Sequence, residues 1–162
     1  MNYHYFNDKI NNKTVNNLVD KLQSMEGKII LQFATTGGNV DSMRFLILYL
    51  NSRKENIKII FTDELSSAGA DILIDFEGDM TFDEGLDFIF FHCGDRMSYP
   101  LRASSTINWK IVTKQDVERN RIYAEKIKNK ELLTPKQLKD FNANKDVIVY
   151  KEQFKEYKFW KL

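Results

Sequence analysis

The sequence predicts an α/β fold in which helices cover a largely parallel β-sheet. Short runs rich in β-branched and aromatic residues alternate with stretches in which apolar residues recur every three or four positions. Strand and helix following one another in this way imply right-handed crossovers between parallel strands. In addition, Gly37-Gly38, Ser67 and His92 each lie at or just after the carboxyl end of a predicted strand. Parallel sheets bind their ligands at that edge.

The first half of the chain contains four predicted strands. The run Ile29-Ile30-Leu31-Gln32-Phe33 is too apolar and β-branched for anything but a buried strand. The helix expected over residues 40–50 is apolar nearly all round, so it lies either centrally in the core or against another chain. The expected elements are an edge strand at 5–6, a helix at 13–25, strands at 29–33 and 57–61, helices at 40–50 and up to 76, and a strand at 87–92.

The second half is mainly helical. A long helix is expected over residues 105–128, kinked or split near Thr113. Another begins with Thr134 as N-cap and Pro135 at the first helical position, and runs to about Phe141. A short strand at 146–150 and a final helix at 151–157 follow.

Length and composition indicate one globular domain, and we expect no cofactor and no metal. The chain has 162 residues, of which 43% are hydrophobic, enough for a sizeable core. Its net charge of +1 gives no reason to expect nucleic acid or a membrane as partner. No apolar run is long enough to span a membrane, and the polar start is no signal peptide. The single cysteine, Cys93, excludes an internal disulfide and multi-cysteine metal clusters. We therefore expect a soluble, cytoplasmic protein.

Charge is unevenly distributed. Between Lys58 and Arg96 the chain has ten acidic residues and neither lysine nor arginine, whereas basic residues predominate from Tyr99 onward. Two solvated faces of opposite sign would explain this pattern. Alternatively, copies of the chain dock acidic face to basic face, or the site prefers cationic substrates.

The stretch Leu65-Ser66-Ser67-Ala68-Gly69-Ala70 lies between a strand-like and a helix-like run. Serine at such a corner commonly caps the helix. The same corner also suits a nucleophile, because backbone N–H groups and the helix dipole stabilise the oxyanion that its attack creates. A nucleophilic serine needs an imidazole base and a carboxylate that orients it. Of the two histidines, His4 lies in a start expected to be mobile, so His92 is the candidate, although a histidine ending an apolar strand is often structural.

Three motifs together resemble the proteolytic subunit of the Clp protease, the ClpP family of serine peptidases (S14). They are Thr35-Thr36-Gly37-Gly38-Asn39-Val40, Ser66-Ser67-Ala68-Gly69-Ala70 and Phe90-Phe91-His92. Family members carry Ser-Pro-Gly-Gly, Ala-Ser-Met-Gly and an apolar strand ending in His-Gln-Pro. The spacings of 30 positions from Gly37 to Ser67, and of 25 from Ser67 to His92, agree with the family without gaps. The segment 146–154 is similar to the one in which the family places its catalytic aspartate.

This resemblance implies a ClpP/crotonase-like fold of stacked βαβ units with a long handle helix. The whole chain, 1–162, would be a single ClpP-like domain with a head at about 5–104 and 134–162 and the handle at about 105–130. It implies Ser67 as nucleophile, His92 as base and Asp146 as the residue that orients the base. The oxyanion hole would come from the N–H groups of Gly38 and Ala68.

The implied activity is that of a serine endopeptidase that cleaves peptides or unfolded protein inside a homo-oligomeric ring. The ring would be heptameric, either single or as two stacked rings, and family members work with AAA+ ATPase partners. Only Met1–His4 precede the first expected strand, so we expect an ungated ring with weak or absent ATPase coupling. The alternatives are a catalytically weak or inactive ClpP-like assembly subunit and a crotonase-type acyl-CoA enzyme.

The chain also departs from the family pattern. Thr36 replaces the turn proline, and Asp63-Glu64-Leu65 replaces Gly-Gln-Ala just before the candidate nucleophile. Two carboxylates at that place would oppose a negative oxyanion.

Overall fold

The computed structural model describes residues 1–92, 121–143 and 145–154. The chain divides into two compact units, and we describe each by itself. The first comprises Met1–Phe91 and Ile148–Leu162, and the second comprises His92–Val147.

The first unit is built on the predicted parallel sheet. The strand order is β1-β2-β3-β5-β6, and β4 also pairs with β3. All pairs among β1 to β5 are parallel, which confirms the α/β class with crossover connections. The strands are β1 (Asn2–Asn7), β2 (Ile29–Thr35), β3 (Ile57–Ser66), β4 (Asp79–Phe82), β5 (Phe88–Phe91) and β6 (Val147–Tyr150).

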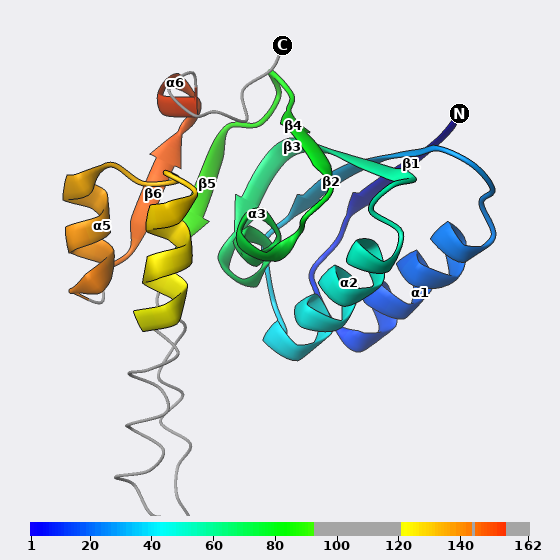
Figure 1. Ribbon diagram of the computed structural model, residues 1–162, viewed down its shortest axis with the longest axis horizontal. Coiled ribbons are helices and arrows are strands. Elements are labelled where there is room, and N and C mark those ends of the chain that lie inside the picture. The colour runs from blue at the N-terminus through cyan, green and yellow to red at the C-terminus, as the bar shows by residue number, and fades with distance from the viewer. Residues whose placement is uncertain (93–120, 144, 155–162) are drawn as a thin grey trace, which may run out of the picture. The chain divides into compact units, whose positions relative to one another are not determined.

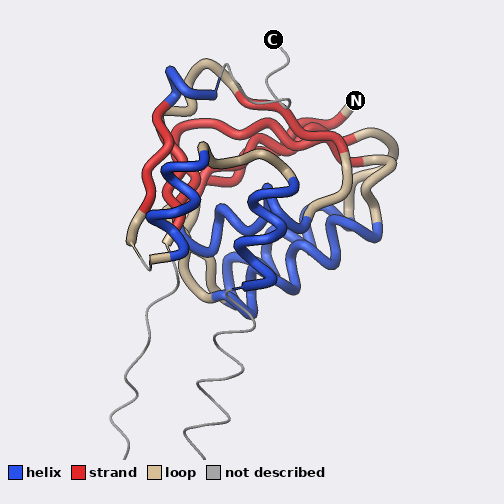
Figure 2. Tube along the Cα trace, turned by 60° about the vertical axis from the view of Figure 1, so that its left-hand side comes forward, coloured by secondary structure: helices blue, strands red, loops and turns tan. Residues whose placement is uncertain are grey.

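Helices α1 (Asn12–Gln23) and α2 (Val40–Ser52) lie side by side against one face of β1, β2 and β3 (Figures 1 and 2). A row of four buried phenylalanines crosses four strands in register on one face of the sheet. Their ring centroids are 5.1, 6.4 and 5.7 Å apart from one strand to the next. The row consists of Phe6, Phe33, Phe61 and Phe82.

Helix α2 is not buried all round. Its buried residues are Ser42, Met43, Leu46, Ile47 and Leu50. Val40, Phe45 and Leu48 are 42%, 50% and 70% exposed, so a central place in the core is wrong for this helix. In this single chain, an apolar part of α2 faces outward.

The second unit contains two described helices, residues 121–129 and α5 (Pro135–Asn142). Thr134 caps α5 as predicted: the Gln137 N–H donates to Thr134 Oγ1 at 3.3 Å, and the Thr134 N–H donates to Gln137 Oε1 at 3.0 Å. The rings of Tyr123 and Phe141 stack at 5.8 Å. Most of the expected handle helix, residues 105–120, lies outside the described residues, so the handle stays a prediction.

The structure differs from the sequence-based expectation at three strands, β1, β3 and β4. β1 starts at Asn2, which places His4 in a strand opposite Leu31, not in a mobile start. β3 continues five residues beyond Phe61, and β4 was not predicted. The final helix, α6 (Lys151–Phe154), begins as expected, and its predicted remainder to 157 lies outside the described residues.

In the described parts of the chain, no helix has both the length and the apolar character needed to cross a membrane.

Candidate active site

Ser67 is the first residue of a short 3₁₀ turn, η1 (Ser67–Ala70), which leads from β3 into α3 (Asp71–Asp75). Its φ of +55° lies in the left-handed region, which costs a non-glycine residue about 1–2 kcal/mol. Strain of this kind collects at functional sites, where the surrounding structure holds it in place. Ser67 is half-buried, whereas Ser66, Ala68 and Gly69 are buried. The corner therefore presents Ser67, not its neighbours.

The capping explanation fails for Ser66. Ser66 occupies the N-cap position of η1, but its side chain makes no capping hydrogen bond there. Instead, its hydroxyl donates to Glu64 Oε2 at 3.4 Å. One of the two expected carboxylates thus lies beside the corner.

The glycine turn, residues 36–38, follows β2 and packs directly against this corner. Gly37 has a φ of +87°, and a Cβ built on it would lie 2.6 Å from Ser66 O and 2.7 Å from Ser67 Cβ. It would also lie 3.2 Å from the Ala68 nitrogen. Only glycine allows so close an approach. The predicted convergence of the turn and the serine at one sheet edge is confirmed for this pair.

Gly38, the candidate oxyanion donor, is held by backbone bonds on either side of it. Ile10 N–H donates to Gly37 O at 2.8 Å, and Asn39 N–H donates to Ile10 O at 2.9 Å. These two bonds form a parallel bridge between Ile10 and Gly38 and do not use the Gly38 N–H. Gly38 is exposed, and its φ of +144° is in the region that favours glycine.

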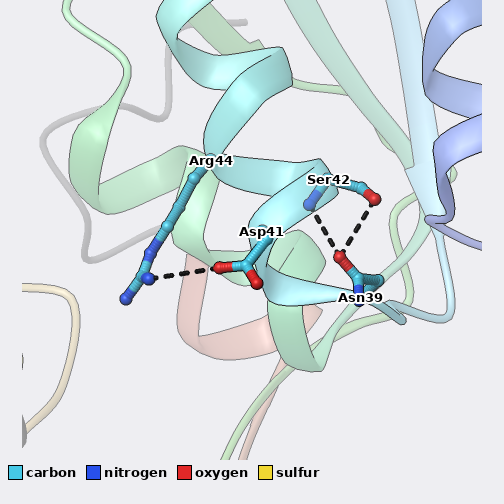
Figure 3. A network of polar contacts seen from close by, with 4 residues as sticks. All are labelled: Asn39, Asp41, Ser42 and Arg44. Carbon is cyan, nitrogen blue, oxygen red and sulfur yellow. Dashed lines mark hydrogen bonds and ion pairs between the residues drawn. The ribbon is translucent and has the colours of Figure 1, made fainter.

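The exit from the turn is fixed by the N-cap of α2 (Figure 3). Asn39 Oδ1 accepts hydrogen bonds from the Ser42 N–H at 2.8 Å and from the Ser42 hydroxyl at 3.0 Å. The Ser42 hydroxyl also lies 2.6 Å from Asn12 Oδ1 in α1. Asp41 and Arg44 form an exposed ion pair at 3.5 Å, which adds little stability.

A bulge in β3 offsets the part of the strand that leads to Ser67. Residues 58–61 of β3 pair with β4, and residues 64–66 pair with β5. Between them Asp63 has a φ of +55°, and the register against β2 shifts at the same level. The Asp63 carbonyl accepts a hydrogen bond from the Asp87 N–H at 2.7 Å, just before β5. Because of the bulge, β3 pairs with β4 before Asp63 and with β5 after it, directly ahead of Ser67.

The Asp63 carboxylate is engaged by the edge strand β1. Tyr5 Oη donates to Asp63 Oδ2 at 2.9 Å, and Asn7 Nδ2 donates to Tyr5 Oη at 2.9 Å. The bond to Asp63 raises the pKa of Tyr5. Of the two carboxylates before Ser67, Glu64 is therefore the one that contacts a serine of the corner.

Lysines from outside the acidic stretch pair with some of its residues. The Lys54, Lys58 and Lys151 ammonium groups lie 2.7, 3.7 and 3.7 Å from carboxylates of the stretch. The bond to Glu77 raises the pKa of Lys54. The carboxylates belong to Glu77, Asp79 and Asp87 respectively. This pairing reduces the net negative charge that the sequence alone suggests for this region.

His92 and Asp146 belong to the second unit. His92 follows β5, whose residue Phe90 pairs with Ser66, so the strands that end before Ser67 and before His92 are parallel neighbours. Asp146 precedes β6. The Lys151 N–H after β6 donates to the Asp87 carbonyl before β5 at 3.1 Å, which makes β6 run opposite to β5. The approach of His92 and Asp146 to Ser67 stays a prediction.

Neither the bonds of Thr35 nor the Tyr5–Asp63 hydrogen bond were predicted from the sequence. The signal for Thr35 was its place directly before the glycine turn, at the end of an apolar strand. No signal in the sequence links Tyr5 to Asp63, 58 positions away.

The chain is similar to the ClpP protease catalytic domain of Plasmodium falciparum, with a TM-score of 0.63 over 99% of this chain and 82% of that one. The chain has a ClpP-like fold. Sequence identity to that domain is 16%, so the likeness concerns the fold. No protein-family model matches the sequence, and no curated protein matches it either. The crotonase-like detail of the ClpP-like fold and its handle helix stay predictions.

Proposed function

We propose that this chain is a serine endopeptidase of the ClpP kind, with Ser67 as its nucleophile. The observation that carries the proposal is the left-handed φ of Ser67 at a strand-to-helix corner, with Gly37 packed against it. A strained corner of this type exposes a serine hydroxyl and surrounds it with backbone N–H groups. The ClpP-like fold supports the same reading, as do the spacings to Gly37 and His92.

In the proposed mechanism, His92 takes the proton of the Ser67 hydroxyl while Oγ attacks the carbonyl carbon of a peptide bond. The N–H groups of Gly38 and Ala68 stabilise the resulting oxyanion. When the intermediate collapses, the C–N bond breaks and His92 gives its proton to the leaving amine. Water then attacks the acyl-enzyme in the same manner, releases the acid and restores Ser67. Asp146 holds the His92 imidazole in the tautomer that accepts the serine proton.

Substrates would be peptides or unfolded protein, and the active form would be a homo-oligomeric heptameric ring, either single or stacked on a second ring. The exposed apolar residues of α2, Val40, Phe45 and Leu48, support a contact between copies, because exposed apolar patches mark interaction sites. Light scattering should give a mass several times that of the 19.1 kDa chain. A monomer at tens of micromolar would contradict the ring. Whether an AAA+ ATPase couples to it is tested by adding such a partner with ATP.

A fluorophosphonate probe tests the peptidase proposal, because it reacts with activated serines. We expect intact mass and peptide mapping to place one adduct on Ser67. Ser67→Ala should abolish labelling and reduce peptide hydrolysis by a factor on the order of a million. Ser66→Ala, one position earlier, is the matched control and should keep both. Equal hydrolysis by the wild type and Ser67→Ala would rule the proposal out.

The second candidate is a ClpP-like assembly subunit with weak or no activity, and the exposed part of α2 favours it equally. The same experiment separates the two, because the subunit would form the oligomer but leave the probe unreacted. A crotonase-type acyl-CoA enzyme is favoured less, since its chemistry does not require a strained serine at this corner.

A further inference from the structure

Thr35, the last residue of β2, is one of three polar residues that are buried in the described part of the chain. Its exposed fraction is 0%. A buried hydroxyl is costly unless it is hydrogen-bonded, so a threonine at this place needs partners. The mechanism proposed above does not use it.

The Thr35 hydroxyl uses its donor and an acceptor site at once. Its Oγ1 donates to the Asp8 carbonyl at 2.8 Å and accepts from the Gly37 N–H at 3.0 Å. Asp8 lies between β1 and α1, and Gly37 lies in the glycine turn. One side-chain oxygen thus joins two loops at the carboxyl edge of the sheet.

The Thr35 methyl group contacts the other side of the site. A Cβ built on Gly69 would collide with Thr35 Cγ2, so Gly69 and the methyl group pack without space between them. Gly69 is part of η1, two residues after Ser67. Thr35 also pairs in register with Leu65 of β3.

We propose that Thr35 is a positioning residue, which holds the glycine turn through its hydroxyl and the serine corner through its methyl group. The packing of Gly37 on Ser66 and Ser67 is a second link between the two halves of the proposed site. Because Gly38 follows Gly37 directly, a turn held at Gly37 N–H keeps the oxyanion donor in a fixed place relative to Ser67. This role rests on the proposed peptidase function.

Two variants of Thr35 test its hydroxyl and its methyl group separately. Thr35→Val keeps the shape and removes the hydroxyl, whereas Thr35→Ser keeps the hydroxyl and removes the methyl group. Thr36→Val is the control, because Thr36 is the next residue along the chain, lies in the glycine turn and is exposed. Thr62→Val is a second control, since Thr62 Oγ1 is buried and has no hydrogen-bond partner among the described residues.

The first readout is amide hydrogen exchange at Gly37, which does not depend on activity. We expect slow exchange in the wild type and in Thr35→Ser, and exchange about ten- to a hundredfold faster in Thr35→Val while the β2 amides stay protected. If Gly37 exchanges at the unprotected rate in the folded wild type, the hydroxyl does not hold the turn. That outcome overturns the proposal without any variant.

The second readout is peptide hydrolysis. Thr35→Val should lower kcat about ten- to a hundredfold with little change in KM, since the oxyanion donor acts in the transition state. Thr35→Ser should lower kcat less than Thr35→Val does, because it keeps the bond to Gly37 and loses the methyl contact with Gly69, and both control variants should stay within twofold of the wild type. A kcat of Thr35→Val within twofold of the wild type would overturn the proposal. If the wild type itself shows no reaction at Ser67, the peptidase proposal fails, and the exchange of Gly37 still decides whether Thr35 holds the turn.

Discussion

Replacing Gly37 by alanine tests the contact between the glycine turn and the serine corner. The new Cβ would lie 2.6 Å from Ser66 O and 2.7 Å from Ser67 Cβ, distances that require the corner or the turn to move. Overpacking of this kind costs about 1–3 kcal/mol. The φ of +87° adds about 1–2 kcal/mol for a residue with a side chain. We therefore expect the free energy of unfolding to fall by about 2–5 kcal/mol.

Gly27→Ala is the matched control for this variant. Gly27 has a similar φ of +75°, but a Cβ there would meet no atom within 4 Å. It reports the backbone cost alone, which we expect to be about 1–2 kcal/mol. The difference between the two variants isolates the close approach at the corner.

Urea denaturation followed by circular dichroism measures both free energies of unfolding, and thermal unfolding measures the corresponding Tm values. At about 2–4 °C per kcal/mol for a chain of this length, Gly37→Ala should lower Tm by roughly 4–20 °C. Its labelling by the fluorophosphonate probe should also slow, whereas Gly27→Ala should react like the wild type. If Gly37→Ala unfolds no more easily than Gly27→Ala, the turn does not press on the corner, and the argument for one joint site is lost.

Three further predictions follow from single residues. Ser67→Gly should abolish probe labelling and yet raise the free energy of unfolding above that of Ser67→Ala by about 1 kcal/mol, because glycine relieves the left-handed φ; equal stability of the two variants in urea would show that Ser67 is not strained. Glu64→Gln should speed labelling about two- to fivefold by removing a charge that opposes the oxyanion, whereas the exposed Glu55→Gln should leave the rate unchanged. Burial, and to a lesser extent Lys21, lower the pKa of His4 from 6.5, so its contribution to stability is present above that pH and is lost as pH falls below it. Between pH 7.5 and pH 5.0, the free energy of unfolding should therefore fall less for His4→Gln than for the wild type. Chemical denaturation at the two pH values measures this, and equal falls for both proteins would refute the account.

Elements with strong local signals could be predicted from the sequence. The run from Ile29 to Phe33 is apolar and β-branched, and the Thr134-Pro135 pair carries the capping chemistry of a helix start. Strand β4 was missed because Asp79–Phe82 is short and begins with a residue that is rare in strands. The extension of β3 was missed for a similar reason, since Asp63 and Glu64 disfavour strands and the bulge that accommodates them depends on β2 and β5.

Within the candidate site, too, some contacts could be predicted from the sequence and others could not. The carboxyl-edge rule for parallel strands predicted that Gly37 and Ser67 would meet, because it depends only on strand direction. The hydroxyl bridge of Thr35 could not be predicted in this way, since it joins Asp8 and Gly37 across 27 and 2 positions of the chain. Similarly, the exposure of Phe45 and Leu48 depends on which part of α2 meets the sheet. An all-round apolar pattern cannot decide that question.

The place of β6 in the sheet has a consequence for the synthesis of the chain. β6 is the neighbour of β5, but 55 residues separate Phe91 from Val147. At about 5–20 residues per second, a ribosome needs roughly 3–11 s to make them. During that time the run Phe88-Ile89-Phe90-Phe91 has no partner on the side that β6 will occupy. An unpaired apolar strand edge readily pairs with other chains, so the nascent protein passes through a stage at which a chaperone would improve its yield.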